Sequence, residues 1–158
     1  MRGIRIRRSV AADVPYIRES SIQTAWESLP PWEREGMSFG DFQETMGKSF
    51  ETFFARPSTT VFVAEGPQGQ VLGYVWLGET ADAFTGEKLA WVYDVTVEAS
   101  QRGQGLGQRL MRRAESFARR RGYRHLGLMV AWHNLAAQGL YGKLGFRAID
   151  LIMRKELR

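Results

Sequence analysis

The feature of this sequence that most restricts its fold is the stretch VTVEASQRGQGLGQRL at residues 95–110. It joins a β-rich run to a helical run through a turn that has glycine at positions 103, 105 and 107. Glycine removes the Cβ atom where a chain turns tightly and where a ligand comes close to main-chain N–H groups. The first N–H groups of the following helix are unpaired and lie at the positive end of its dipole. The stretch therefore predicts an anion site, and phosphate is the anion such a loop most often meets.

Two other phosphate-binding patterns do not fit this turn. A P-loop needs a lysine after its last glycine, and a dinucleotide-binding fold needs G-x-G-x-x-G near its first strand. Neither pattern is present. A glycine-rich connection without a ligand is the plain alternative. Eight arginines between positions 102 and 124 favour a multiply phosphorylated ligand, although a solvated helix face accounts for most of them.

Charge is distributed unevenly along the chain, whose net charge is +5. Residues 1–100 contain 9 basic and 14 acidic side chains, whereas residues 101–158 contain 13 basic and 3 acidic ones. The two parts are therefore expected to attract ligands of opposite charge. A polyanion is expected on the C-terminal part and a cationic ligand on the N-terminal part.

The hydrophobic periodicity changes several times along the chain. Strands are expected at 4–8, 59–65, 71–79, 89–98, 126–130 and 149–157, and helices at 11–27, 39–54, from 106 to about 121, and 134–144. Within 89–98 the odd positions are apolar, whereas Asp94, Thr96 and Glu98 share the other face. This order indicates an α/β (α+β) fold in which helices cover a central sheet.

Composition narrows the function classes further. No repeat or linker divides residues 1–158, which indicates a single domain. The absence of cysteine excludes disulfides, thiolate zinc sites and cysteine nucleophiles, and two histidines are too few for a convincing metal site. No apolar run approaches the ~20 residues of a membrane span. A cytoplasmic protein without a membrane partner is expected.

Two motifs together resemble those of the GNAT superfamily of N-acetyltransferases. Its cofactor signature is Arg or Gln, two residues, Gly, one residue, and Gly or Ala, and it is matched by Arg102, Gly105 and Gly107. The family's downstream pattern N-x-x-A-x-x-L-Y, followed shortly by G-F, is matched by Asn134, Ala137, Leu140, Tyr141, Gly145 and Phe146. The resemblance covers residues 60–157 well and the first 58 only in element order. One departure is Ala99, where many relatives have proline.

The resemblance implies a mixed sheet of about six to seven strands, splayed between the fourth and fifth, and acetyl-CoA as co-substrate. The main chain of Val95 and Val97 would pair with the pantetheine arm. Residues Arg102, Gly103, Gln104, Gly105, Leu106, Gly107 and Gln108 would hold the pyrophosphate through their N–H groups. Asn134, Ala137 and Tyr141 would also contact the cofactor. A homodimer is common among such proteins.

The implied reaction transfers an acetyl group to a primary amine of a small molecule or peptide by direct attack. A lysine-like amine has a pKa of ~10.4 and must lose a proton before it attacks, so a general base is useful. Asp94 is the first candidate for this base, and a structural carboxylate is an equal alternative for it. Glu79 is a further candidate, and Glu98 is expected to make a turn contact. Tyr141 matches the family's usual acid for the CoA thiolate.

Two competing functions follow from the same residues. A non-catalytic acyl-CoA-binding regulatory module would keep the fold without the chemistry. Nucleic-acid binding through the arginine-rich helix would need an aromatic stacking set or a reading element, and neither is recognisable. We therefore expect acetyl-CoA and an amine as partners, and no nucleic acid.

Overall fold

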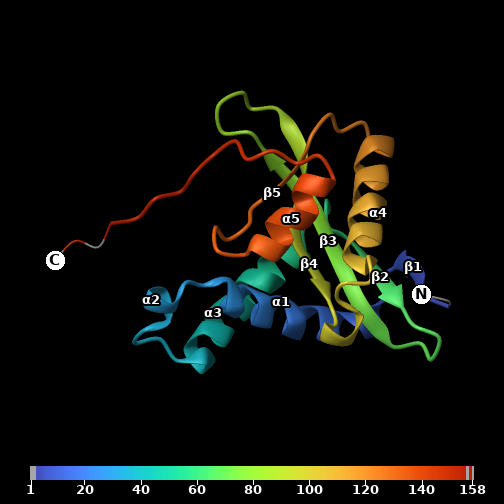
Figure 1. Cartoon of the computed structure of the whole chain (residues 1–158), viewed down its shortest axis with the longest axis horizontal. Helices are drawn as coiled ribbons and strands as arrows, with labels where there is room; N and C mark the ends of the chain where they lie inside the picture. Colours follow the sequence, from blue (N-terminus) through green and yellow to red (C-terminus); the bar gives the residue numbers. More distant parts are fainter. Residues whose placement is uncertain (1–2, 156, 158) are drawn as a thin grey trace.

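A computed structural model describes residues 3–155 and residue 157, and its strands form one sheet. The strands are β1 (Arg5–Arg8), β2 (Thr60–Glu65), β3 (Val71–Ala81), β4 (Lys88–Val97) and β5 (Leu126–Leu128). They lie in the order β1-β2-β3-β4-β5 (Figure 1). Neighbours from β1 to β4 are antiparallel, whereas β4 and β5 are parallel. A mixed sheet is thus confirmed.

Helices cover both faces of this sheet (Figure 1). They are α1 (Val14–Ser28), α2 (Pro31–Arg34), α3 (Phe39–Phe54), α4 (Leu106–Arg120) and α5 (Leu135–Lys143), with 3₁₀ turns η1 (Ala11–Asp13) and η2 (Ala99–Gln101). Ile17 of α1 and Phe50 of α3 pack with Tyr74 and Trp76 on one face. On the opposite face, the buried residues of α4 are Leu106, Leu110, Met111, Ala114 and Ala118. The two apolar layers enclose the sheet, and α4 is the helix that follows the glycine-rich turn.

Local sequence signals set the ends of the helices. The Ser38 hydroxyl accepts a hydrogen bond from the N–H of Asp41 at 3.1 Å and caps α3, which ends shortly before Pro57. Gly122, with φ of 82°, follows the last turn of α4. Among the described residues, no helix is long and apolar enough to cross a membrane.

A partly buried ion pair joins β1 to the start of α1. The guanidinium of Arg7 binds both carboxylate oxygens of Asp13, at 2.7 and 3.0 Å. This contact lowers the pKa of Asp13, which also accepts a hydrogen bond from the N–H of Val10. The pair fixes the first turn of α1, the helix that borders the site described below.

The expectation of a closing strand at 149–157 is wrong. In the described part of this segment the chain has no regular structure, and the sheet has five strands rather than six or seven. An alternating or apolar segment is suited to a strand, but a strand forms only where a neighbour supplies its hydrogen bonds. No strand of the same chain pairs with residues 149–155.

Candidate active site

A gap opens in the sheet between β4 and β5. Their pairing is limited to three residue pairs and ends at Val92 and Leu128, whereas β4 stays paired with β3 as far as Val97. From Tyr93 to Val97, therefore, one edge of β4 has no strand beside it in the part of the chain that the structure describes. This confirms the predicted splay between the fourth and fifth strands.

A β-bulge at Tyr93 decides which main-chain groups face the gap. Trp76 and Leu77 of β3 pair with Asp94 and Val92, so that Tyr93 is an extra residue in β4. The uniform alternation expected for 89–98 is therefore wrong. Val92 and Val95 pack against the α4 layer, whereas Tyr93 packs against the α1 and α3 layer.

Beyond the bulge, main-chain orientation can be followed from two hydrogen bonds. The N–H of Glu98 donates to the carbonyl of Leu72 in β3, at 3.0 Å. Because orientation alternates along a strand, Val95 and Val97 turn their N–H and C=O groups toward the gap. The carbonyl of Val97 accepts a hydrogen bond from Nε of Arg102 at 3.1 Å. This orientation suits the predicted pairing of these two residues with an extended cofactor arm.

A row of unpaired N–H groups lies beside the end of β4. The N–H of Arg102 donates to the carbonyl of Ala99 at 3.3 Å, and the hydrogen-bond ladder of α4 starts where Arg109 donates to Gly105 at 3.1 Å. Between them, within the described chain, the N–H groups of residues 103–108 make no main-chain hydrogen bond. Six successive donors at the N-terminus of a long helix are suited to binding an anion. The row begins at Gly103, one residue later than the sequence analysis expected.

The three glycines of this turn serve two different needs. Gly103 and Gly105 have φ of 74° and 80°, which other residues rarely adopt. At Gly107 the constraint is space, because a Cβ atom there would lie 3.3 Å from Cδ2 of Leu140 and 3.7 Å from Cγ2 of Val97. Gly107 thus lets α4 approach both α5 and β4.

The downstream motif forms α5 and places Tyr141 near the gap. Oδ1 of Asn134 accepts a hydrogen bond from the N–H of Ala137 at 3.1 Å and caps the helix. Tyr141 is partly buried, and its ring lies 5.7 Å from that of Phe146. Burial and the nearby charge of Asp94 raise the pKa of Tyr141 to about 12. The Tyr141 hydroxyl therefore remains protonated at neutral pH.

Asp94 lies on the α1 side of β4, next to the gap. Its carboxylate accepts hydrogen bonds from the hydroxyl of Tyr74 and, at 3.4 Å, from that of Thr96. Burial raises its pKa to about 6, even though these hydroxyls and Ser21 favour the charged form. At neutral pH Asp94 is mostly ionised, and its pKa is close to that of an effective general base.

A groove of about 370 Å³ separates α1 from the end of β4. Thr24 and Thr96 line it, and their hydroxyl oxygens are 3.0 Å apart. Because Thr96 also hydrogen-bonds Asp94, a chain of hydroxyls connects the groove to this carboxylate. The sequence analysis missed Thr24 and Tyr74. The signal for Thr24 is the polar stripe of α1 that lines the groove, namely Tyr16, Glu19, Ser20, Gln23, Thr24 and Glu27.

The other two carboxylates considered from sequence have structural partners. Glu98 accepts a hydrogen bond from the hydroxyl of Tyr16 at the groove. Glu79 pairs with Lys88 at 3.1 Å and accepts a hydrogen bond from Tyr123 at 2.6 Å, and these contacts lower its pKa. Neither Glu79 nor Asp94 lines the groove, but Thr96 of the groove hydrogen-bonds Asp94, so Asp94 stays the first candidate for the base. In the described residues, no group of three or more His, Asp or Glu forms a metal site.

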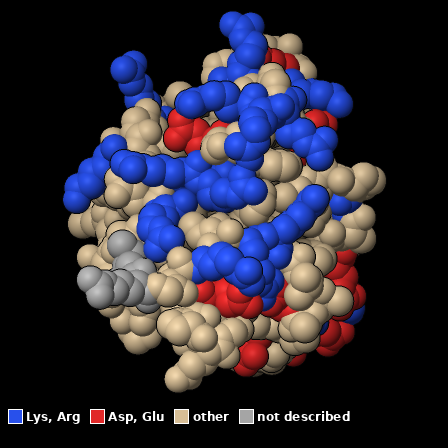
Figure 2. Space-filling model, turned by 90° about the vertical axis from the view of Figure 1, so that its right-hand side faces the viewer, with Lys and Arg blue, Asp and Glu red and all other residues tan. Residues whose placement is uncertain are grey.

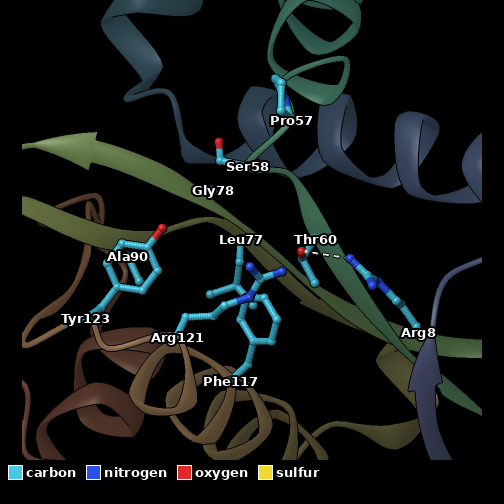
Figure 3. A pocket seen from close by; sticks show the side chains of 10 residues that line it. All are labelled: Arg8, Pro57, Ser58, Thr60, Leu77, Gly78, Ala90, Phe117, Arg121 and Tyr123. Carbon is cyan, nitrogen blue, oxygen red and sulfur yellow. Dashed lines mark hydrogen bonds between the residues drawn. The ribbon is translucent and has the colours of Figure 1, made fainter.

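A second, smaller cavity of about 80 Å³ lies between the start of β2 and the end of α4 (Figure 3). Its walls are Arg8, Pro57, Ser58, Thr60, Leu77, Gly78, Ala90, Phe117, Arg121 and Tyr123. The guanidinium of Arg8 donates to the hydroxyl of Thr60 at 3.2 Å. None of the residues from 94 to 108 contributes to this cavity, which is therefore separate from the gap.

Basic side chains gather on one face of the molecule (Figure 2). Some arginines of α4 have structural contacts: Arg113 lies 4.1 Å above the centre of the Phe62 ring, and Arg119 pairs with Glu115 at 2.5 Å. The basic face adds positive potential to the half of the chain that contains the glycine-rich turn.

The acetyltransferase (GNAT) family matches this chain over residues 23–146. The chain belongs to the GNAT family. An uncharacterized N-acetyltransferase of Bacillus subtilis, YdgE, is 36% identical over 90 residues, which are 57% of this GNAT chain and 56% of YdgE. The match therefore spans little more than half the length of that relative.

Solved structures share the fold of this GNAT chain. A putative acetyl transferase from Pyrococcus furiosus is 28% identical, with a TM-score of 0.86 over 98% of this chain and 99% of that one. A predicted acetyltransferase from Clostridium acetobutylicum, solved with acetyl-CoA, has a TM-score of 0.73 and 14% identity, and the match covers 97% and 96% of the two chains. At that identity the second likeness concerns the fold alone.

Proposed function

We propose that this chain transfers an acetyl group from acetyl-CoA to a primary amine of a small molecule or peptide, by direct attack. The observation that carries the proposal is the row of six N–H donors at residues 103–108, next to the open edge of β4. A diphosphate fits such a row, and an extended thioester arm fits the edge. The acetyl-CoA bound to the Clostridium acetobutylicum protein of the same fold supports this choice.

In the proposed complex, the diphosphate binds the N–H groups of residues 103–108, and the pantetheine arm pairs with the main chain of Val95 and Val97. This arm then leads the thioester toward Asp94 and Tyr141. With its oxygen occupied in capping α5, Asn134 still has its side-chain N–H₂ group to donate to the arm. Residues 1–158 act as one transferase domain in this proposal.

The groove beside α1 is the proposed acceptor site. Three carboxylates line it, from Glu19, Glu27 and Glu98, against one arginine, Arg102. This excess of negative charge favours a cationic amine over an acidic acceptor. Since Thr24 and Thr96 connect the groove to Asp94, a proton lost by the bound amine has a path of hydroxyls to the carboxylate.

The proposed reaction is a single displacement. The neutral amine attacks the thioester carbon, a C–N bond forms, and the carbonyl oxygen becomes an oxyanion that a main-chain N–H at Val95 stabilises. When the C=O bond re-forms, the C–S bond breaks and the sulfur leaves with the electron pair. Asp94 accepts the proton that the bound ammonium loses before the attack. Tyr141 then donates its proton to the departing sulfur and recovers one from the nitrogen, which loses its second proton as the amide forms. No covalent enzyme intermediate is needed.

A thiol-release assay with acetyl-CoA tests the proposal across polyamines, aminoglycosides, amino acids and peptides with free N-termini. We expect release of CoA thiol with cationic amines. Binding of CoA without release by any acceptor would contradict the enzymatic proposal and favour a regulatory acyl-CoA-binding module. Exclusive use of acidic acceptors would contradict the assignment of the groove.

A further inference from the structure

The small cavity between the start of β2 and the end of α4 is lined by cations (Figure 3). Arg8, the last residue of β1, and Arg121, which follows α4, both contribute to its wall. Among the described residues that line it there is no Asp or Glu. Two like charges that face one space repel each other unless an anion lies between them. The cavity therefore has the charge of an anion-binding site.

Arg8 is held at the cavity by a neutral side chain. Its neighbour Arg7 pairs with Asp13 and Glu65. Arg8 has no carboxylate partner in the described chain, and its guanidinium donates to the hydroxyl of Thr60 at 3.2 Å. Thr60 is only 4% exposed, and its hydroxyl still has its own proton to donate. Because a guanidinium has several N–H groups, most of those of Arg8 also remain for a ligand.

Arg121 reaches the same cavity from the end of α4. The negative end of a helix dipole favours cations, which accounts for basic residues in this turn. One of them, Arg119, pairs with Glu115 of its own helix. Arg121 has no carboxylate partner among the described residues, and its Cζ atom lies 5.4 Å from the centre of the Phe117 ring, which also lines the cavity. The ring thus holds the guanidinium at the cavity and leaves its N–H groups available.

Figure 3 shows the guanidinium groups of Arg8 and Arg121 on either side of Thr60. We propose that this cavity binds a phosphate group, either as inorganic phosphate or as the phosphoryl end of a small phosphate ester. The planar guanidinium groups match phosphate oxygens, and the buried hydroxyl adds a third donor. A phosphate monoester carries a charge of about −1.5 to −2 at pH 7, which balances two arginines. The volume of about 80 Å³ exceeds the needs of a single water molecule and suits a group of this size.

The phosphate site is separate from the glycine-rich turn. Gly105 and Arg121 lie at opposite ends of α4, about 24 Å apart along its axis. None of the residues from 94 to 108 lines the cavity. The site therefore goes beyond the proposed transferase function and does not depend on it.

Calorimetric titration of the full chain with inorganic phosphate, at saturating CoA, tests the proposal. CoA then occupies the glycine-rich turn, so the remaining phosphate binding reports on the cavity. We expect binding that weakens about tenfold or more in both Arg8→Gln and Arg121→Gln. Arg124→Gln is the matched control, because it removes the same charge from a side chain that is 82% exposed and does not line the cavity.

The outcome can be distinguished from failure of the transferase proposal. If CoA does not bind, the same titration without CoA still tests the cavity, because only a phosphate in the cavity responds to Arg8→Gln and Arg121→Gln but not to Arg124→Gln. A wild-type chain that binds no phosphate, or equal weakening in all three variants, would overturn the proposal.

A second pair of variants separates a specific site from a merely charged surface. Thr60→Val removes the buried hydroxyl, whereas Thr60→Ser keeps it, and circular dichroism checks that both fold. We expect phosphate to bind several-fold more weakly to Thr60→Val and with near wild-type affinity to Thr60→Ser. Titration with glycerol phosphate shows whether an ester or inorganic phosphate is preferred, and acetate tests the ligand class. Wild-type affinity in Thr60→Val, or acetate bound as tightly as phosphate, would overturn the proposal.

Discussion

The hydroxyl of Tyr74 donates a hydrogen bond to the carboxylate of Asp94 on the neighbouring strand, and the side chain of Tyr74 is fully buried. This contact fixes the carboxylate on the α1 side of the gap. The surrounding burial raises the pKa of Asp94 to about 6, and the Asp94 charge in turn contributes to the raised pKa of Tyr141. The ionisation state of Asp94 therefore changes with pH close to neutrality.

The Asp94→Asn variant should lose the pH dependence of a general base. The wild-type carboxylate accepts a proton only when ionised, so kcat/KM should rise as pH increases through about 6. In Asp94→Asn we expect a fall of roughly 10²–10³-fold at pH 7.5, with this rise abolished. Glu79→Gln is the matched control and should retain the profile. A rise through pH 6 that persists in Asp94→Asn would show that another group is the base.

The same substitution should stabilise the fold at neutral pH. The folded-state pKa of Asp94 is raised from 3.8 to about 6, so the folded protein favours the neutral carboxyl group. The resulting contribution to the free energy of unfolding is fully present below pH 3.8 and is lost as pH rises through about 6. Asp94→Asn should therefore increase the free energy of unfolding on the order of 1 kcal/mol at pH 7.5, and much less at pH 4. Urea unfolding at the two pH values measures this, and an equal destabilisation at both would contradict it.

Tyr141→Phe should lower turnover while leaving cofactor binding nearly intact. The phenol is protonated at neutral pH and is proposed to donate to the leaving sulfur, so its loss should reduce kcat by about 10²–10⁴-fold. Calorimetric titration should show a CoA affinity within a few-fold of the wild type. Tyr123→Phe, which removes a hydroxyl bonded to Glu79, should keep full activity. An active Tyr141→Phe variant would remove this residue from the mechanism.

Gly105→Ala should weaken the binding of CoA. At φ of 80°, a Cβ atom costs on the order of 1 kcal/mol, and relief of that strain would turn the N–H row away from the diphosphate. Gly86→Ala is a matched control, because Gly86 has φ of 71° in a distant loop with open space around it. We expect a rise of about tenfold or more in the dissociation constant for Gly105→Ala only. Equal affinities in the two variants would contradict the role of the turn.

Glu19→Gln combined with Glu27→Gln should impair the use of cationic acceptors. Removing two of the three groove carboxylates should raise KM for a polyamine several-fold, with a smaller effect on KM for a neutral amine. Glu44→Gln, at an exposed ion pair on α3, is the control. Steady-state kinetics at low salt would show the effect most clearly. An unchanged KM for the polyamine would place the acceptor elsewhere.

Local signals made much of this architecture predictable from sequence. The limits of α3 follow from Ser38 and Pro57, and those of α5 from Asn134 and Gly145, because caps and breakers act within a few residues. The glycine turn and the start of α4 were predictable for the same reason, since they are contiguous in the sequence.

Features that depend on distant partners were not predictable. The bulge at Tyr93 exists only in the pairing of β4 with β3, and it reverses the main-chain orientation that a uniform alternation would give. The contact between Tyr74 and Asp94 and the approach of Thr24 to Thr96 join separate elements. The expected strand at 149–157 is wrong because a sequence suited to a strand forms one only where another strand pairs with it.

Amide NMR of the ¹⁵N-labelled chain, titrated with CoA, tests the central claim most directly. The account predicts that the N–H signals of residues 103–108 shift strongly and saturate at one CoA per chain, together with those of Val95 and Val97. If CoA left these signals unchanged, or shifted only those of residues elsewhere, the site proposed here would be contradicted.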